Sequence, residues 1–200
     1  MNRKFAVRVT TYTTAVLVSI TLAMLVFALM VFTGNAHAYE QRGLDLLKSK
    51  DICVGCDLSG APLRGASLRG VDLSGANLRR ADLSQTNLIH AHLSGADLRN
   101  ARLDGASILG VRLLGVDLRG AALRGTDLRG AFLGGSNLGG ANLRDADLRG
   151  AVLGGVNLSG ADLSGADMRD SIGLTQERLD SACGDSGTRL PHEFHIAACR

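Results

Sequence analysis

Leucine recurs at nearly every fifth position from Leu58 to Leu163, and this spacing limits the possible fold more than any other feature of the sequence. Residues 56–170 divide into 23 consecutive five-residue units with no insertion or deletion. The central residue of the unit, position i, is Leu in 21 units, and position i+2 is Gly in 17. Position i−2 is small, most often Ala.

A period of five fits neither an α-helix nor a β-strand, whose side chains repeat every 3.6 and 2 residues. A helix would spread these leucines around its whole surface, and a strand would send successive leucines to opposite faces. A chain that turns a corner every five residues points each Leu at one common axis, with Gly relieving the steric cost of a positive φ at the corner. The spacing therefore predicts a solenoid with a filled interior.

The units resemble the pentapeptide-repeat family, whose consensus is A(D/N)LxG; Ala161-Asp162-Leu163-Ser164-Gly165 is one example. The resemblance implies an all-β solenoid, a right-handed quadrilateral β-helix with four units in each coil and short helical caps. Coils about 4.8 Å apart would make a rod of about six coils and roughly 28 Å. Such a stack needs caps because its ends expose unpaired backbone.

The sequence on either side of the repeat predicts two caps. Residues 39–55 form the N-terminal cap, with an amphipathic segment that contains several leucines. Residues 171–200 form the C-terminal cap, with a short helix that begins after Thr175 as N-cap and ends at Gly184.

The first 38 residues have the layout of a secretory signal peptide. Three basic residues precede an uncharged apolar run at 15–32, and Ala36 and Ala38 stand where a signal peptidase requires small side chains. We expect cleavage after Ala38 and a periplasmic or secreted protein. The alternative is an inner-membrane anchor formed by residues 15–32, which are close to the length of a bilayer span; only then would a membrane be a partner.

Removal of residues 1–38 leaves 19 basic and 19 acidic residues. A neutral chain gives no electrostatic reason to expect nucleic acid as a partner. Within the repeat, Arg at i+1 and Asp at i−1 recur at intervals of twenty residues, for example Arg129, Arg149 and Arg169 with Asp127, Asp147 and Asp167. In a four-sided coil these residues stack, so we predict ladders of ion pairs that neutralise one another.

Four cysteines flank the repeat: Cys53, Cys56, Cys183 and Cys199. In the solenoid that the resemblance implies, the two ends lie far beyond the Cα separation of about 7 Å that a disulfide tolerates. This leaves the pairs Cys53–Cys56 and Cys183–Cys199. Because an exported chain meets an oxidising compartment, we predict one disulfide in each cap.

Two other interpretations of the cysteines remain open. The first is a redox motif at Cys53 and Cys56, but that chemistry needs a thiolate stabilised by a helix N-terminus, for which this sequence shows no pattern. The second is zinc held by Cys183 and Cys199 with His192 and His195. We favour the disulfides, and we predict no metal and no cofactor.

One side of the predicted coil departs from the charged pattern. We name its apolar residues, Leu114, Phe132 and Val152, the apolar strip; Ile89 and Leu109 lie on the neighbouring side. A contiguous exposed apolar surface usually marks a docking surface. The alternative is that the chain's own C-terminal tail, with Leu190, Phe194 and Ile196, folds back over the strip.

These observations favour a non-enzymatic exported protein that serves as an interaction or structural scaffold in the cell envelope. The partner would be an unidentified envelope protein or a second copy of the chain. We find no catalytic residues in the sequence, and a filled coil offers no cleft. The alternative comes from the resemblance: some family members mimic duplex DNA and bind topoisomerase, an activity that the neutral repeat and the export signal disfavour.

Overall fold

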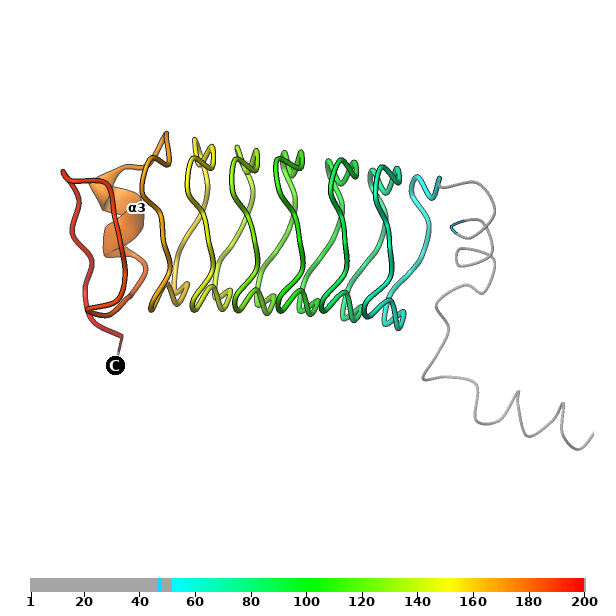
Figure 1. The fold of residues 1–200 in the computed structure, drawn as a ribbon, viewed down its shortest axis with the longest axis horizontal. Coiled ribbons are helices and arrows are strands. Elements are labelled where there is room, and N and C mark those ends of the chain that lie inside the picture. Colours follow the sequence, from blue (N-terminus) through cyan, green and yellow to red (C-terminus); the bar gives the residue numbers. More distant parts are fainter. Residues whose placement is uncertain (1–46, 48–51, 200) are drawn as a thin grey trace, which may run out of the picture. The chain divides into compact units, whose positions relative to one another are not determined.

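The computed structural model describes Leu47 and residues 52–199 (Figure 1). Every described residue belongs to the unit Tyr39–Arg200. The predicted signal peptide lies outside the described residues, as does the N-terminal cap before Ile52 apart from Leu47, which is buried in the core. Among the described residues, no helix has the length and apolar character needed to span a bilayer.

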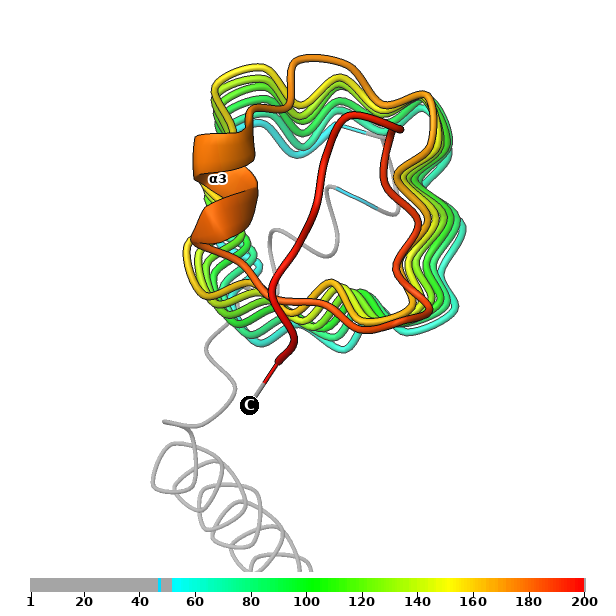
Figure 2. The same cartoon turned by 90° about the vertical axis from the view of Figure 1, so that its left-hand side faces the viewer.

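Residues 52–172 form a stack of coils. One residue in every five makes a parallel β-bridge to the residue twenty positions further on, so each coil has four sides. Viewed along the stack, the coil is nearly square (Figure 2). The bridges are isolated single residues, and residues 52–199 contain no extended strand. The four-sided coil is therefore present, but single-residue bridges hold it together in place of continuous β-strands.

We name the four sides by their bridge residues. In steps of twenty, side 1 runs from Ile52 to Ile172, side 2 from Asp57 to Asn157, side 3 from Pro62 to Asp162 and side 4 from Ser67 to Asp167.

Each corner of the coil is a hydrogen-bonded β-turn. The carbonyl of Leu58, for example, accepts a bond from the N–H of Ala61 at 3.0 Å, and Leu58 N–H donates to Asn77 in the next coil at 2.8 Å. The corner residue at i+2 has a φ between 56° and 72° throughout the repeat, while i+1 does not have a positive φ. This combination defines a type II turn, which explains the preference for Gly at i+2.

The core consists of the residues at positions i and i−2. The central leucines from Leu58 to Leu163 are between 0% and 6% exposed. Burial of each Leu is worth about 1.5–3 kcal/mol. Two threonines at i−2 satisfy their hydroxyl groups: Thr86 donates to the carbonyl of Leu83 at 2.7 Å, and Thr126 donates to that of Leu103 at 2.8 Å. The interior is thus filled by side chains.

The regular coil extends beyond both predicted boundaries of 56 and 170. Residues 52–55 have the same bridge and turn pattern, with buried Cys53 in the position that Leu occupies elsewhere. The small apolar side chain of Cys53, whose sulfur is joined to Cys56, fits this inner position as Leu does. At the other end, Ser171 and Ile172 continue side 1 before Gly173 replaces the central Leu and the regular pattern ends.

Helix α3, Gln176–Asp180, forms the start of the C-terminal cap and stacks on side 2, where Ser181 accepts a bond from Gly160 N–H at 2.6 Å. Thr175 is the N-cap as predicted, although its side chain makes no capping bond. The C-cap is Ser181, three residues before the predicted stop at Gly184, since the chain must return to the coil at Cys183. Cys183 and Arg189 then form bridges to sides 3 and 4.

Candidate docking surface

The outer residue at i−1 has a structural task in most units. The N–H of i+1 lies in the turn and takes no part in the ladder between coils. An Asp or Asn at i−1 accepts a hydrogen bond from it: Asp72 accepts from Ser74 N–H, and Asn157 from Ser159 N–H, both at 3.0 Å. Local side-chain bonds of this kind are typical of Asp and Asn in turns. They explain why the repeat prefers these two residues at i−1.

Side 2 uses this bond in every coil. Its six bridge residues are all Asp or Asn, and each accepts the N–H of the residue two positions later: Asp57, Asn77, Asp97, Asp117, Asn137 and Asn157. The backbone of side 2 is therefore satisfied within the chain.

Side 1 lacks these bonds over four consecutive coils. His92, Arg112, Phe132 and Val152 replace Asp or Asn at i−1. The corresponding N–H groups find no acceptor among the described residues, and they belong to Ser94, Leu114, Gly134 and Gly154. Unpaired backbone donors at a surface must be satisfied by water or by another molecule. Side 1 thus presents a row of available donors.

The apolar strip lies beside these donors. Leu114 is 47% exposed and Phe132 is 44% exposed, while Val152 is half-buried. On the neighbouring side, Leu109 is exposed and Ile89 is half-buried. The side chain of Leu114 reaches over the next corner, because a Cβ on Gly134 would lie 3.4 Å from Leu114 Cδ2. Side 1 therefore combines exposed apolar side chains with glycines, which add no side chain above the backbone.

The chain's own tail does not cover the apolar strip. Phe194 and Ile196 pack partly buried against the end of the core, and Gly184 N–H donates to Ala197 at 2.8 Å. Figure 2 shows the C-terminal segment crossing the end of the coil. The alternative in which the tail folds back over the strip is therefore wrong: the tail closes the end of the stack, where exposed leucines need a cover.

The Asp and Arg residues of side 4 form the predicted ladder. Arg149 Nη2 lies 2.6 Å from Asp147 Oδ2, and its Nε lies 3.9 Å from Asp167 Oδ2 in the next coil. Arg169 Nη2 lies 2.6 Å from Asp167 Oδ2. The hydrogen bonds from Arg169 lower the pKa of Asp167 to about 2. The carboxylates on this side are compensated, so they do not form a continuous acidic surface.

The cysteines form the two predicted pairs, with Cα separations of 5.3 Å for Cys53–Cys56 and 4.8 Å for Cys183–Cys199. The first pair closes the corner of the first described coil. The second joins the bridge residue of side 3 to the end of the tail, and so fixes the tail across the stack.

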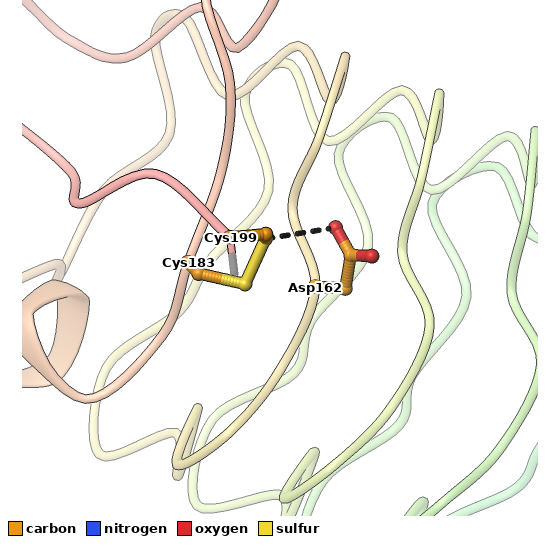
Figure 3. Close-up of side chains that lie close together, drawn as sticks. All are labelled: Asp162, Cys183 and Cys199. Carbon is orange, nitrogen blue, oxygen red and sulfur yellow. Dashed lines mark hydrogen bonds between the residues drawn. A yellow bond between two sulfur atoms is a disulfide. The ribbon is translucent and has the colours of Figure 1, made fainter.

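Asp162 lies against the second disulfide (Figure 3). Its Oδ1 is 3.3 Å from Cys199 Sγ; because a disulfide sulfur carries no proton, this is a contact and not a hydrogen bond. Ser164 donates to the same oxygen from N–H at 2.9 Å and from its hydroxyl at 2.6 Å. Arg144 Nη1 donates to Oδ2 at 3.2 Å. Burial opposes ionisation, but the bonds from Ser164 and Arg144 outweigh it and lower the pKa of Asp162.

The sequence profile for pentapeptide repeats matches this chain in eight copies over residues 56–172, which is more than half of its length. The chain belongs to the pentapeptide-repeat family. Members of this family are generally non-enzymatic structural or interaction proteins. No curated protein is significantly similar to this chain in sequence.

Several solved structures of pentapeptide-repeat proteins are similar to this one. A protein from the thylakoid lumen of Arabidopsis thaliana is 38% identical over 54% of this chain and 71% of its own, with a TM-score of 0.39. A trypsin-treated form of QnrB1, a plasmid-mediated fluoroquinolone resistance protein, is 27% identical over 68% and 80%, with a TM-score of 0.40. Rfr23 from the cyanobacterium Cyanothece is 29% identical over 75% and 98%, with a TM-score of 0.33.

Sequence reasoning missed two features of this pentapeptide-repeat protein. Ile172, which is 59% exposed, extends the apolar strip by one coil, but it lies past the last unit with a recognisable centre. The sequence pattern marks Asp162 only as a residue of the repeat consensus, although it contacts the cysteine pair in place of His192 and His195. Neither histidine joins the group of possible ligands around these cysteines within the described residues.

Proposed function

We propose that this pentapeptide-repeat protein is an exported, non-enzymatic scaffold of the cell envelope that docks a partner on side 1. The observation that carries the proposal is the coincidence of exposed apolar side chains with unpaired backbone donors on one side of the coil. A partner would bury Leu114, Phe132 and Ile172 and supply acceptors for the row of N–H groups. Burial of aromatic and aliphatic side chains with a few polar contacts is how most docking surfaces gain affinity.

The charge distribution argues against one class of partner, the DNA-processing enzymes that bind DNA mimics. Mimicry of DNA requires a surface of uncompensated negative charge. On side 4 each of the three carboxylates from Asp127 to Asp167 has an Arg partner at 2.6–2.8 Å. Within the described residues, side 1 itself carries Asp72 as its one acidic bridge residue. The export expected from residues 1–38 also separates the chain from cytoplasmic DNA enzymes.

The test is affinity capture from an envelope extract with three forms of the chain. The wild type is compared with a Phe132→Asp, Leu114→Asp double variant and with Ala122→Asp as the matched control. Ala122 occupies the same i−1 position on side 3, so the control adds a carboxylate to a different side. Asp is a common residue at i−1, the position of Phe132 and Ala122. Asp104 already occupies i+1, the position of Leu114, so we expect all three forms to fold.

We expect the wild type and Ala122→Asp to retain the same protein, or a second copy of the chain, and the double variant to lose it. Sedimentation of the purified chain separates self-association from a foreign partner. Identical captured proteins for all three forms would exclude docking on side 1. Capture of nothing by any form would favour a structural spacer without a ligand.

A further inference from the structure

Three groups that can bind a metal converge in the C-terminal cap. One carboxylate oxygen of Asp162 and the sulfur atoms of Cys183 and Cys199 all lie within 4.8 Å of one another (Figure 3). All three residues are half-buried, so a small reductant and an ion can reach them. While the two sulfur atoms are joined, neither is available as a ligand.

The cap holds the two cysteines together by more than their disulfide. Gly184 N–H donates to Ala197 at 2.8 Å, and Cys199 N–H donates to Gly184 at 2.9 Å. Gln176 adds two bonds to the backbone of His195, at 3.0 and 3.2 Å. These contacts place the backbone of the tail beside side 3 without the covalent bond. After reduction, the two thiols would therefore remain close to each other and to Asp162.

Asp162 is also held as a metal ligand would be. Ser164 fixes one carboxylate oxygen and Arg144 the other, as hydrogen-bond donors orient metal-binding carboxylates in established metal sites. A carboxylate in contact with a thiol disfavours the thiolate, and a divalent cation offsets this penalty because it compensates two of the three negative charges. Two sulfur ligands and one oxygen suit Zn²⁺, with water in the fourth position of its tetrahedron.

We infer that the C-terminal cap is a redox-controlled site for a thiophilic divalent cation such as Zn²⁺, with Asp162, Cys183 and Cys199 as its ligands. A small-molecule thiol reduces the disulfide: two thiol molecules become one disulfide, and Cys183 and Cys199 each gain a proton and an electron. Zn²⁺ then displaces the two thiol protons and binds both sulfur atoms and the carboxylate. Bonds of about 2.0–2.3 Å from a central ion fit donors this close together.

The test is the rate of alkylation of each cysteine in the reduced full chain, with and without Zn²⁺, read by mass spectrometry of the peptides. We expect Zn²⁺ to slow the alkylation of Cys183 and Cys199 severalfold, because a thiolate bound to the ion is no longer free to react as a nucleophile. Cys53 and Cys56 are the internal control, since no carboxylate joins them in a group of ligands among the described residues. They should be alkylated at nearly the same rate in both conditions.

The Asp162→Asn variant tests the third ligand. An amide can still accept the bonds from Ser164, so the cap should fold, but it is a much weaker zinc ligand. We expect most of the protection of Cys183 and Cys199 to be lost. Equal protection of both cysteine pairs would indicate non-specific binding to thiols. Equal protection of the two pairs would overturn the inference. Full protection of Cys183 and Cys199 in Asp162→Asn would also overturn it, as would no protection in the wild type.

Discussion

Sides 1 and 2 of the coil have the same backbone and share one core, yet their outer surfaces differ. On side 2, the Asp or Asn of all six coils from Asp57 to Asn157 accepts the free N–H of its turn. On side 1, four consecutive coils from His92 to Val152 leave that N–H unpaired and present apolar or basic side chains. The bridges between coils continue through both sides without interruption.

The difference shows that the coil does not depend on the residue at i−1. Position i supplies the buried Leu and i+2 the turn, whereas i−1 adds one local hydrogen bond. A side can therefore lose that bond over several coils and keep its register. A run of apolar residues in this position adds nothing to the core that a polar residue would lack, which supports the proposal that side 1 binds a partner. The predictions below test this division.

The largest effect is expected in the core, and it should be the same on both sides. Leu133 belongs to side 1 and Leu138 to side 2, and both are fully buried. Replacement of either by Ala should lower the free energy of unfolding by about 2–5 kcal/mol, through lost burial and a residual cavity. Urea denaturation of both variants measures this. A much smaller cost for Leu133→Ala would mean that side 1 is a looser part of the coil, and that its exposed residues reflect poor packing.

The same division explains which features the sequence predicted. The four sides, the ladders and the separation of the two cysteine pairs followed from the resemblance to pentapeptide-repeat proteins. The five-residue period itself determines what points inward, and it predicted a solenoid with a filled interior. It did not detect Cys53 in the Leu position or Ile172 before Gly173, because the period was read from central leucines. The place of the tail depends on contacts such as that of Gly184 with Ala197, which no local pattern encodes. The unpaired donors of side 1 do have a sequence signal: the absence of Asp and Asn at i−1.

The next effect concerns the local bond itself. Asn157→Ala on side 2 should lower the free energy of unfolding by about 1 kcal/mol, because Ser159 N–H loses its acceptor. Val152→Ala on side 1 removes no such bond and is the matched control in the same coil. We expect its cost to be a few tenths of a kcal/mol, since Val152 is only half-buried. Equal costs for the two variants, measured by the same denaturation, would contradict the role assigned to Asp and Asn.

A smaller, pH-dependent effect belongs to the charges of side 2. The hydrogen bonds from Arg119 lower the pKa of Asp117. A lowered folded-state pKa stabilises the folded chain above the unfolded value of about 3.9, and this contribution is lost as the pH falls through the folded pKa. Asp117→Asn keeps an acceptor for Arg119 N–H but removes the ion pairs with Arg119 and Arg99. Because these side chains are partly exposed, we expect a loss of about 0.5 kcal/mol at pH 7.

The difference between Asp117→Asn and the wild type should shrink in 1 M salt and should vanish in strong acid. Val152→Ala, which changes no charge, should show neither dependence. A difference that persists unchanged at low pH would mean that the substitution disturbs the turn and not the ion pair.

The smallest effect is expected for Phe132→Asn on side 1, and it separates binding from stability most directly. The substitution removes the contacts of a side chain that is 44% exposed, and it supplies an acceptor for the unpaired N–H of Gly134. Loss of partial burial and gain of a turn bond are each worth about 1 kcal/mol and have opposite signs. The free energy of unfolding should therefore change by less than about 0.5 kcal/mol. If Phe132→Asn instead lowers the free energy of unfolding as much as a core substitution does, then Phe132 serves to stabilise the coil. If stability is unchanged, the coil has no need of an aromatic residue at this position, and the reason for Phe132 must be sought in what binds to side 1.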